Sequence, residues 1–318
     1  MKKYILKRIG LSMSTVSIVA IVVFFMTHIL PGNVARRYLG RDGTPEDYIN
    51  FNKQYGLDRP LVVQLFSWLR DLLSGNLGIS MQYQRSVSEV MLPAIGYSAR
   101  LATLAFFIII PVSIAGGIYA AMKRGKAPDR IITVGGLSAA VIPEFIWAVL
   151  LILIFGVTFQ IFPVTAFPTT PNPGIAVQIW HLVLPSISLL LVLFGYIARI
   201  TRAGVIEALD SDYMRTAVLK GYSRRKAVTK HVLRNALLPT IAVTASQIPY
   251  LIGGLVAVEL VFNYPGFGTV LLTAVGAHDF AILQSGVMLT STVIVLFQLI
   301  ADILFAILNP RIRQRISE

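Results

Sequence analysis

The chain has 318 residues, of which 55% are hydrophobic and only 14% are charged, and its formal net charge is +13. A soluble domain usually carries about 25% charged residues, so this composition excludes a soluble enzyme, a disordered chain and a small disulfide scaffold. The isoelectric point near 10.1 could indicate nucleic-acid binding, but a mean hydropathy of +0.72 argues against that class. The absence of Cys excludes disulfides, thiolate metal ligands and Cys nucleophiles.

Six long apolar runs follow one another along the chain. About 20 apolar residues are enough to cross a bilayer as a helix, and each run has at least that length. The first run is longer than the apolar core of a secretory signal, so we expect an uncleaved helix. The sequence therefore predicts an all-α polytopic membrane protein with six transmembrane helices. The runs are residues 9–30, 101–122, 131–160, 179–198, 236–258 and 280–301, the last continuing to 308.

The distribution of basic residues predicts the orientation of these helices. If the N-terminus lies in the cytoplasm, the inside segments hold 20 of the 28 Lys and Arg residues. The short outer loops 161–178 and 259–279 then hold none. Because short loops rich in Lys and Arg stay in the cytoplasm, both termini are expected on the cytoplasmic side.

The segments between the runs predict the domain organisation. Residues 1–30 are the N-terminal tail and first transmembrane helix. Residues 31–100 contain turn signals and mixed apolar stretches, and we expect a small extracytoplasmic helical cap there. Residues 101–318 form a five-helix transmembrane core, which includes a long basic cytoplasmic loop at 199–235.

The loop 199–235 carries signals for the ends of helices. Asp210 or Ser211 can cap the first turn of a helix, and Gly221 suits the left-handed conformation that ends one. The sequence predicts a short helix, a Gly turn and a second helix that leads into the fifth apolar run. A solvated basic loop and a docking surface for a cytoplasmic partner both fit this pattern.

Short motifs occur in a fixed order over the whole chain. They are Tyr4-Ile-Leu-Lys-Arg-Ile9, His28-Ile-Leu-Pro-Gly32, Tyr55-Gly-Leu-Asp-Arg-Pro60, Gly75-Asn-Leu-Gly-Ile-Ser80, Ala198-Arg-Ile-Thr-Arg202, Asp212-Tyr-Met-Arg-Thr-Ala217, His231-Val-Leu-Arg-Asn-Ala236, Val258-Glu-Leu-Val-Phe262, Pro265-Gly-Phe-Gly268 and Leu308-Asn-Pro-Arg-Ile312. In this order, and at these places relative to six runs, the chain resembles the permease subunit of ATP-binding-cassette importers. The similarity is to the dipeptide, oligopeptide and nickel branch.

The loop departs from the general importer pattern, which is Glu-Ala-Ala, three residues, Gly, nine residues and Ile-x-Leu-Pro. Arg215-Thr-Ala217 replaces Glu-Ala-Ala, and Gly221 is retained. His231-Val-Leu-Arg234 stands where Ile-x-Leu-Pro would be. These departures resemble the peptide and nickel branch, and the roles of the absent Glu and Pro are not transferred to Arg215 and Arg234.

The resemblance implies that this loop is a coupling helix that sits in a groove on a cytoplasmic ATPase subunit. It also implies two such ATP-binding subunits, a second homologous permease and an extracytoplasmic substrate-binding protein. The expected location is among the lipids of a bacterial or archaeal cytoplasmic membrane. The implied coupling residues are Asp212, Tyr213, Arg215, Thr216, Ala217, Lys220, Gly221, His231, Arg234 and Asn235.

The chain itself is expected to be non-catalytic, with no cofactor or metal of its own and with ATP and Mg²⁺ on the partner subunits. A P-loop requires G-x-x-x-x-G-K-[ST], but around Gly125-Lys126 the other two required positions hold Ala120 and Ala127. A membrane enzyme is disfavoured because the four His show no H-x-x-x-H spacing. The long basic loop disfavours a channel or receptor subunit that works without ATPases.

Three polar residues are candidates for the translocation pathway or its gate. Glu144 lies deep in the third run, where a carboxylate is by default a functional hypothesis; it can line the pathway, pair at a helix break or permease interface, or be structural. Gln247 in the fifth run can line the pathway or hydrogen-bond between helices. Glu259 and the following Pro-Gly-Phe-Gly resemble an external gate and equally fit a simple turn.

The substrate class follows from the resemblance alone. Peptides are favoured, and nickel chelates, glutathione and oligosaccharides remain alternatives, because in this family the external binding protein usually sets the specificity.

Overall fold

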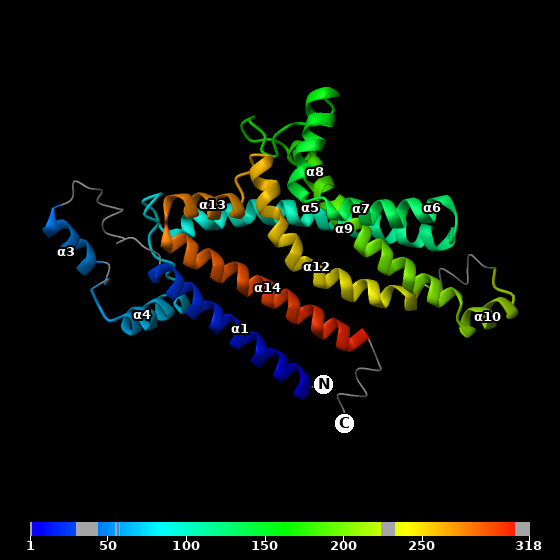
Figure 1. Ribbon diagram of the computed structural model, residues 1–318, viewed down its shortest axis with the longest axis horizontal. Helices are drawn as coiled ribbons and strands as arrows, with labels where there is room; N and C mark the ends of the chain where they lie inside the picture. The colour runs from blue at the N-terminus through cyan, green and yellow to red at the C-terminus, as the bar shows by residue number, and fades with distance from the viewer. Residues whose placement is uncertain (1, 30–43, 55, 57, 224–232, 309–318) are drawn as a thin grey trace. The chain divides into compact units, whose positions relative to one another are not determined.

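The computed structural model describes residues 2–29, 44–54, 56, 58–223 and 233–308 (Figure 1). In these residues the regular structure is helical, apart from an isolated antiparallel bridge between Ile79 and Ser86. The helices are α1 (Lys2–Ile29), α3 (Pro45–Gln54), α4 (Leu61–Leu73), α5 (Val87–Met122), α6 (Ala127–Arg130), α7 (Gly136–Val141), α8 (Glu144–Leu151), α9 (Ile175–Leu209), α10 (Asp212–Leu219), α12 (Leu233–Val261), α13 (Phe267–Ala277) and α14 (Phe280–Leu308), with π-helical segments η1 (Ile131–Gly135) and η2 (Ile152–Thr158).

Four of these helices, α1, α5, α9 and α14, are long and apolar enough to cross a membrane. Two bent helix pairs, in residues 127–158 and 236–261, raise the number to six if each pair forms one span. The predicted class, an all-α polytopic membrane protein, is confirmed. The count of six and the cytoplasmic position of the termini stay predictions.

The third predicted span is sharply bent and not one straight helix. The axes before and after residues 142–143 differ in direction by 103°. Ile142 has an extended backbone, with φ −82° and ψ 124°, because a residue that precedes proline avoids the helical region. The carbonyl of Ala139 near the break accepts hydrogen bonds from the Ile142 N–H at 3.2 Å and from Trp147 Nε1 at 2.9 Å. They replace the helical hydrogen bond that Pro143 cannot donate.

Two helices are longer than the apolar runs that predicted them. α5 begins at Val87, inside the region expected to form the external cap, and α9 continues to Leu209, inside the expected cytoplasmic loop. Val205 and Ala208 in the added turns of α9 are buried. Tertiary packing therefore maintains the helix where hydropathy no longer indicates a span.

By its internal contacts the chain divides into two compact units. The first contains Met1–Ile9, Ile95–Thr269 and Leu296–Glu318, and the second contains Gly10–Ala94 and Val270–Val295. Each unit has its own hydrogen-bonded and packed interior, and each is described separately below.

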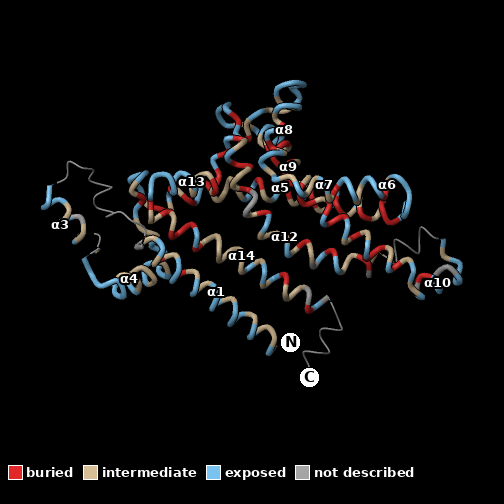
Figure 2. Tube along the Cα trace, in the orientation of Figure 1, coloured by how far each residue is buried: buried red, intermediate tan, exposed pale blue. Residues whose placement is uncertain are grey.

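In the first unit α9 is the central helix, and its buried residues stand out in Figure 2. Of its most apolar window 61% is buried, against 28% for α5. At Gly195 an added Cβ would lie 2.2 Å from the backbone of Gly136 in α7, so only glycine permits this close contact. The Thr240 hydroxyl of α12 donates to the Thr201 hydroxyl of α9 at 3.2 Å. The neighbours of α9 are thus held tightly against it.

In the second unit a buried carboxylate organises the start of α14. Asp279 is 1% exposed and accepts hydrogen bonds from the Ser80 hydroxyl and from the backbone N–H groups of Gln82 and Ile282. It thereby caps α14 and fixes the turn that follows α4. Gln284 Nε2 of α14 donates to Thr27 Oγ1 of α1 at 2.6 Å, which joins these two helices within the unit.

Candidate functional site

The short helix α10 follows α9 almost without a linker. The backbone N–H of Asp210, which caps the end of α9, donates to the Ile206 carbonyl at 3.0 Å. The Ser211 carbonyl accepts the N–H of Met214 at 3.1 Å and so begins the next helix. The direction of α10 is therefore set by the end of α9.

One face of α10 is anchored in the first unit. The Met214 side chain is 6% exposed and belongs to a cluster with residues from three other helices. These are Ala121 of α5, Val205 and Ala208 of α9, and Ala236 of α12. Three of the four are alanine, so the helices approach closely and the long, adaptable Met side chain fills the space between them.

The opposite face of α10 is open. The side chains of Asp212 and Arg215 are 100% and 78% exposed, and their closest approach of 3.9 Å is a weak ion pair. Leu219 is 87% exposed at the end of the helix. Thr216 and Lys220 are exposed beside it. This face thus combines exposed charged side chains with the exposed Leu219 and is covered by no described residue.

Gly221 ends α10 as its residue type predicts. Its φ is +83°, a left-handed conformation that is costly for residues with a Cβ. An added Cβ would meet nothing within 4 Å, so the requirement for glycine comes from the backbone and not from space. The N–H of Lys220 donates to the Thr216 carbonyl at 3.0 Å, which completes the last turn.

The remaining candidates of the loop are only partly visible. Tyr213 and Ala217 belong to α10, and Arg234 and Asn235 belong to the first turn of α12, but their side chains lie outside the described residues. His231 lies outside them entirely.

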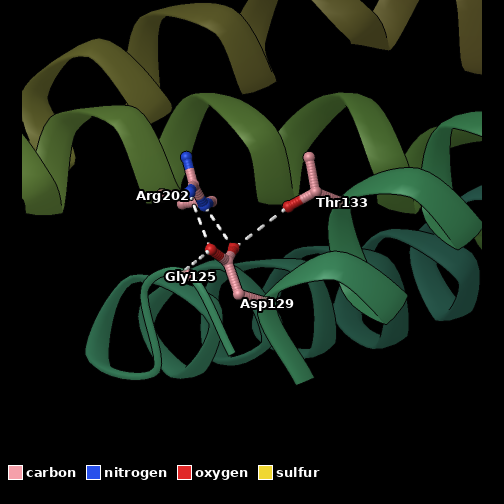
Figure 3. A network of polar contacts seen from close by, with 4 residues as sticks. All are labelled: Gly125, Asp129, Thr133 and Arg202. Carbon is pink, nitrogen blue, oxygen red and sulfur yellow. Dashed lines mark hydrogen bonds and ion pairs between the residues drawn. The ribbon is translucent and has the colours of Figure 1, made fainter. Parts of the chain in front are cut away.

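A buried ion pair joins α6 to α9, and sequence reasoning did not single it out (Figure 3). Asp129 in α6 is 4% exposed. Arg202 of α9 binds both of its carboxylate oxygens, with Nε at 2.5 Å and Nη2 at 2.8 Å. The N–H of Gly125 donates to the same carboxylate at 2.8 Å, and the Thr133 hydroxyl lies 3.4 Å away. The loop between α5 and α6 is thereby fixed to α9.

A second, exposed ion pair lies at the joint between α9 and α10. Arg124 Nη1 is 3.0 Å from Asp210 Oδ2, and both side chains are more than half exposed. The sequence contained a signal that could have pointed to these residues. Arg202 is the last residue of the motif Ala198-Arg-Ile-Thr-Arg202, and Asp129 is the one acidic residue in the basic segment 123–130.

Glu144 begins α8 directly after the break at Pro143. A carboxylate at this position is stabilised by the positive N-terminal end of the helix. The Tyr250 hydroxyl of α12 lies 3.5 Å from Glu144 Oε2, which is a long contact. Glu144 is partly exposed, and the contact with Tyr250 is the one side-chain hydrogen bond it makes with the residues that the structure describes.

Gln247 lines an apolar recess between α5, α9 and α12. The recess is also lined by Thr244, one turn earlier on α12, and its other walls are aliphatic or aromatic. Thr244 Oγ1 is buried and makes no hydrogen bond within the described part of the chain. The two polar side chains therefore face an otherwise apolar space. The apolar lining residues are Phe106, Ile109, Ile110, Leu193, Ile197, Ile248 and Leu251.

Glu259 is fully buried near the end of α12, at 0% exposure. Its carboxylate accepts hydrogen bonds from the Ser98 hydroxyl and from the N–H groups of Gly268 and Thr269, the latter two at 2.8 and 3.3 Å. It therefore caps the first turn of α13. An added Cβ at Gly266 would lie 2.2 Å from this carboxylate, so the Pro-Gly-Phe-Gly motif provides the room that Glu259 occupies.

The presence of several helices long and apolar enough to cross a membrane, with the short helix α10 anchored at the end of α9, agrees with the comparisons to known proteins. Residues 113–314 match the family of binding-protein-dependent transport system inner membrane components, and residues 1–112 match the N-terminal region of such components. The chain belongs to this family. The permease is thus a multi-pass inner-membrane component of an ATP-binding-cassette importer, a family whose members work in complexes with ATPase and binding-protein partners.

Three named transporter permeases are similar to this permease over nearly its whole length. It is 33% identical to a probable peptide transporter permease of Sinorhizobium fredii, over 98% of this chain and 99% of that one. It is 32% identical to the dipeptide transport system permease of Escherichia coli, over 99% and 100%. It is 34% identical to the glutathione transport system permease of Salmonella choleraesuis, again over 99% and 100%.

Proposed function

We propose that this permease imports di- and oligopeptides, forms the translocation path with a second homologous permease, and docks on an ATPase subunit through α10. Two relatives are named for peptides or dipeptides, and the third for glutathione, which is itself a small peptide. The chain would be non-catalytic, and ATP and Mg²⁺ would bind to the partner subunits in a bacterial or archaeal cytoplasmic membrane. Residues 31–100 would lie on the extracytoplasmic side.

The observation that carries the docking proposal is the two-sided character of α10. A solvated loop has no need for a helix whose inner face is anchored by Met214 and whose outer face leaves Leu219 87% exposed. A single large apolar side chain among charges fits a groove on a protein partner. Asp212, Arg215, Thr216 and Lys220 would form the polar rim around it.

The same contacts supply a route for coupling. A movement of α10 reaches α5, α9 and α12 through the Met214 cluster, and it reaches α6 through Asp129 and Arg202. Because packed helices move as rigid bodies, closure of the ATPases would reposition these helices together. This is a free-energy linkage between the nucleotide state and the state of the permease.

Glu144 and Gln247 are our candidates for contact with the transported peptide. Glu144 offers a partly exposed carboxylate to a peptide ammonium group, and Gln247 with Thr244 offers hydrogen-bonding groups to a peptide backbone. Glu259 has its carboxylate occupied by three donors of the permease itself. We therefore assign Glu259 to holding the α12–α13 turn and not to substrate contact.

The test is co-purification and ATP hydrolysis with Leu219→Asp and, as its matched control, Leu219→Met. In liposomes with peptide-loaded binding protein, we expect Leu219→Asp to reduce both ATPase retention and stimulated hydrolysis by about tenfold, a loss of about 1.4 kcal/mol. Leu219→Met keeps an apolar contact and should retain both. Wild-type ATPase retention and stimulated hydrolysis in Leu219→Asp would contradict docking through this face. Transport by the permease without any ATPase would instead indicate a channel.

The substrate class is tested separately. Uptake of a labelled dipeptide into the same liposomes should be competed by other peptides and not by oligosaccharides or nickel chelates. Competition by glutathione alone would narrow the class to that peptide.

A further inference from the structure

Helix α4 has two chemically different sides. At 100° per residue, its apolar side chains other than Val63 occupy one broad sector, and Gln64, Ser67, Arg70 and Asp71 fall on the other side with Val63. Such a division is typical of a helix that lies between a polar and an apolar environment.

Only part of the apolar sector is packed against the protein. Trp68 contacts Phe24 of α1, with ring centroids 5.8 Å apart, and Phe24 is 2% exposed. The rest of the sector carries Val62, Phe66 and Leu73, which are 61%, 67% and 88% exposed. No residue of α4 is buried. A row of large apolar side chains therefore extends beyond the contact with α1.

The contact with Phe24 fixes the depth of α4 relative to the bilayer. Phe24 lies five residues before Ile29, the last residue of α1. At 1.5 Å per residue this is about 7.5 Å along the helix. Since α1 crosses the membrane, a helix that touches it at this level lies below its end and not in the water above it. Amphipathic helices at a membrane surface are inserted by about 5–10 Å, which matches this depth.

The surface of α1 around this level points to the same occupant. Ile21, one turn before Phe24 and on the same side of α1, is 44% exposed, and Val22 and Met26, on the far side from Phe24, are 48% and 65% exposed. In a spanning helix such residues are covered by lipid unless another subunit covers them. A Trp at this level is also typical of the membrane–water interface, because its ring is apolar and its N–H is polar.

We propose that α4 is an interfacial helix of the bilayer leaflet in which α1 ends. Val62, Phe66 and Leu73 contact the acyl chains of lipids, Trp68 packs on α1, and Arg70 and Asp71 face the headgroups and water. The segment after α1 is then held in the plane of the membrane, at a fixed distance from α1. The inference needs only that α1 spans the membrane, so it does not depend on the identity of the substrate or of the ATPase partner.

The absence of Cys from the chain makes the test direct. Single variants Val62→Cys, Phe66→Cys and, as the polar-side control, Asp71→Cys would each be spin-labelled in the assembled transporter in liposomes. Collision of the label with oxygen, which concentrates in lipid, would be compared with collision with a water-soluble nickel chelate.

We expect labels at 62 and 66 to collide at least threefold more with oxygen than with nickel, relative to the label at 71. More collision with nickel at 62 and 66 would place this face in water and overturn the proposal. Low collision with both probes would mean that a protein subunit covers the face, which would overturn it as well. Leu73→Cys provides a second position if Phe66→Cys does not assemble.

Discussion

Helix α10 and the turn around Glu259 both contain motifs that resemble those of importer permeases, but their polar groups are exposed in α10 and buried in the turn. In α10 the charged side chains are exposed, and the helix is held by the apolar Met214. In the turn the carboxylate of Glu259 is buried and satisfied by three donors of the chain. A motif residue that is already fully paired maintains the fold, whereas one left unpaired at the surface is available to a partner.

The largest effect is expected from Glu259→Leu, which removes the acceptor of three buried or partly buried donors. Each unsatisfied donor costs about 1–3 kcal/mol, so the free energy of unfolding should fall by about 3–5 kcal/mol. Denaturant unfolding of the purified permease in detergent measures this loss. Glu259→Gln keeps one acceptor oxygen and should lose less.

A stable Glu259→Leu variant that has lost only transport would reverse the assignment. Glu259 would then act in the pathway or gate, and the comparison with α10 would no longer hold.

The next largest effect is expected at the buried ion pair between α6 and α9, the helix from which α10 follows. Asp129→Asn leaves Arg202 without its charged partner in a mostly buried site, and we expect a loss of about 2–3 kcal/mol in unfolding free energy. Arg124→Ala removes the exposed pair with Asp210 and should change stability by less than about 0.5 kcal/mol. Parallel unfolding curves of the two variants measure the difference, and equal losses would show that burial is not what distinguishes the pairs.

Met214→Ala should have a smaller effect on global stability and a clear effect on α10. Removal of a buried Met side chain costs about 2 kcal/mol or more in a closed core, but α10 lies at the edge of one. We therefore expect about 1–2 kcal/mol and faster amide hydrogen exchange in Asp212–Leu219 than in the wild type. Exchange that stays unchanged would mean that Met214 does not anchor the helix.

The sequence predicted the features that depend on hydropathy and on local residue types. The apolar runs located the membrane helices, Gly221 located the end of α10, and the capping candidates Asp210 and Ser211 located its start. Both are local signals: a run long enough for a bilayer, and residues suited to the ends of helices.

The features that the sequence did not predict depend on contacts between distant residues. A proline indicates a break but not its size, so the 103° bend before Glu144 was not foreseen. One partner of Glu259, the Ser98 hydroxyl, lies 161 residues away in the chain, and one partner of Asp129, Arg202, lies 73 residues away. A hydropathy profile does not tell whether a carboxylate inside a run, such as Glu144, or just after one, such as Glu259, is buried, and burial is what distinguishes the two in the structure.

The smallest effect on stability is expected from Glu144→Gln. Glu144 is partly exposed, and its contact with Tyr250 is 3.5 Å long. The substitution should therefore change the free energy of unfolding by less than about 0.5 kcal/mol. Loss of its charge should nevertheless weaken uptake of peptides with a free ammonium group by about fivefold, or about 1 kcal/mol. Uptake of labelled peptides with free and with acetylated N-termini measures this difference. Tyr250→Phe is the control, because it removes the hydroxyl and keeps the carboxylate. If free and acetylated peptides are affected equally, Glu144 does not recognise the ammonium group, and its exposure reflects only its place at the start of α8.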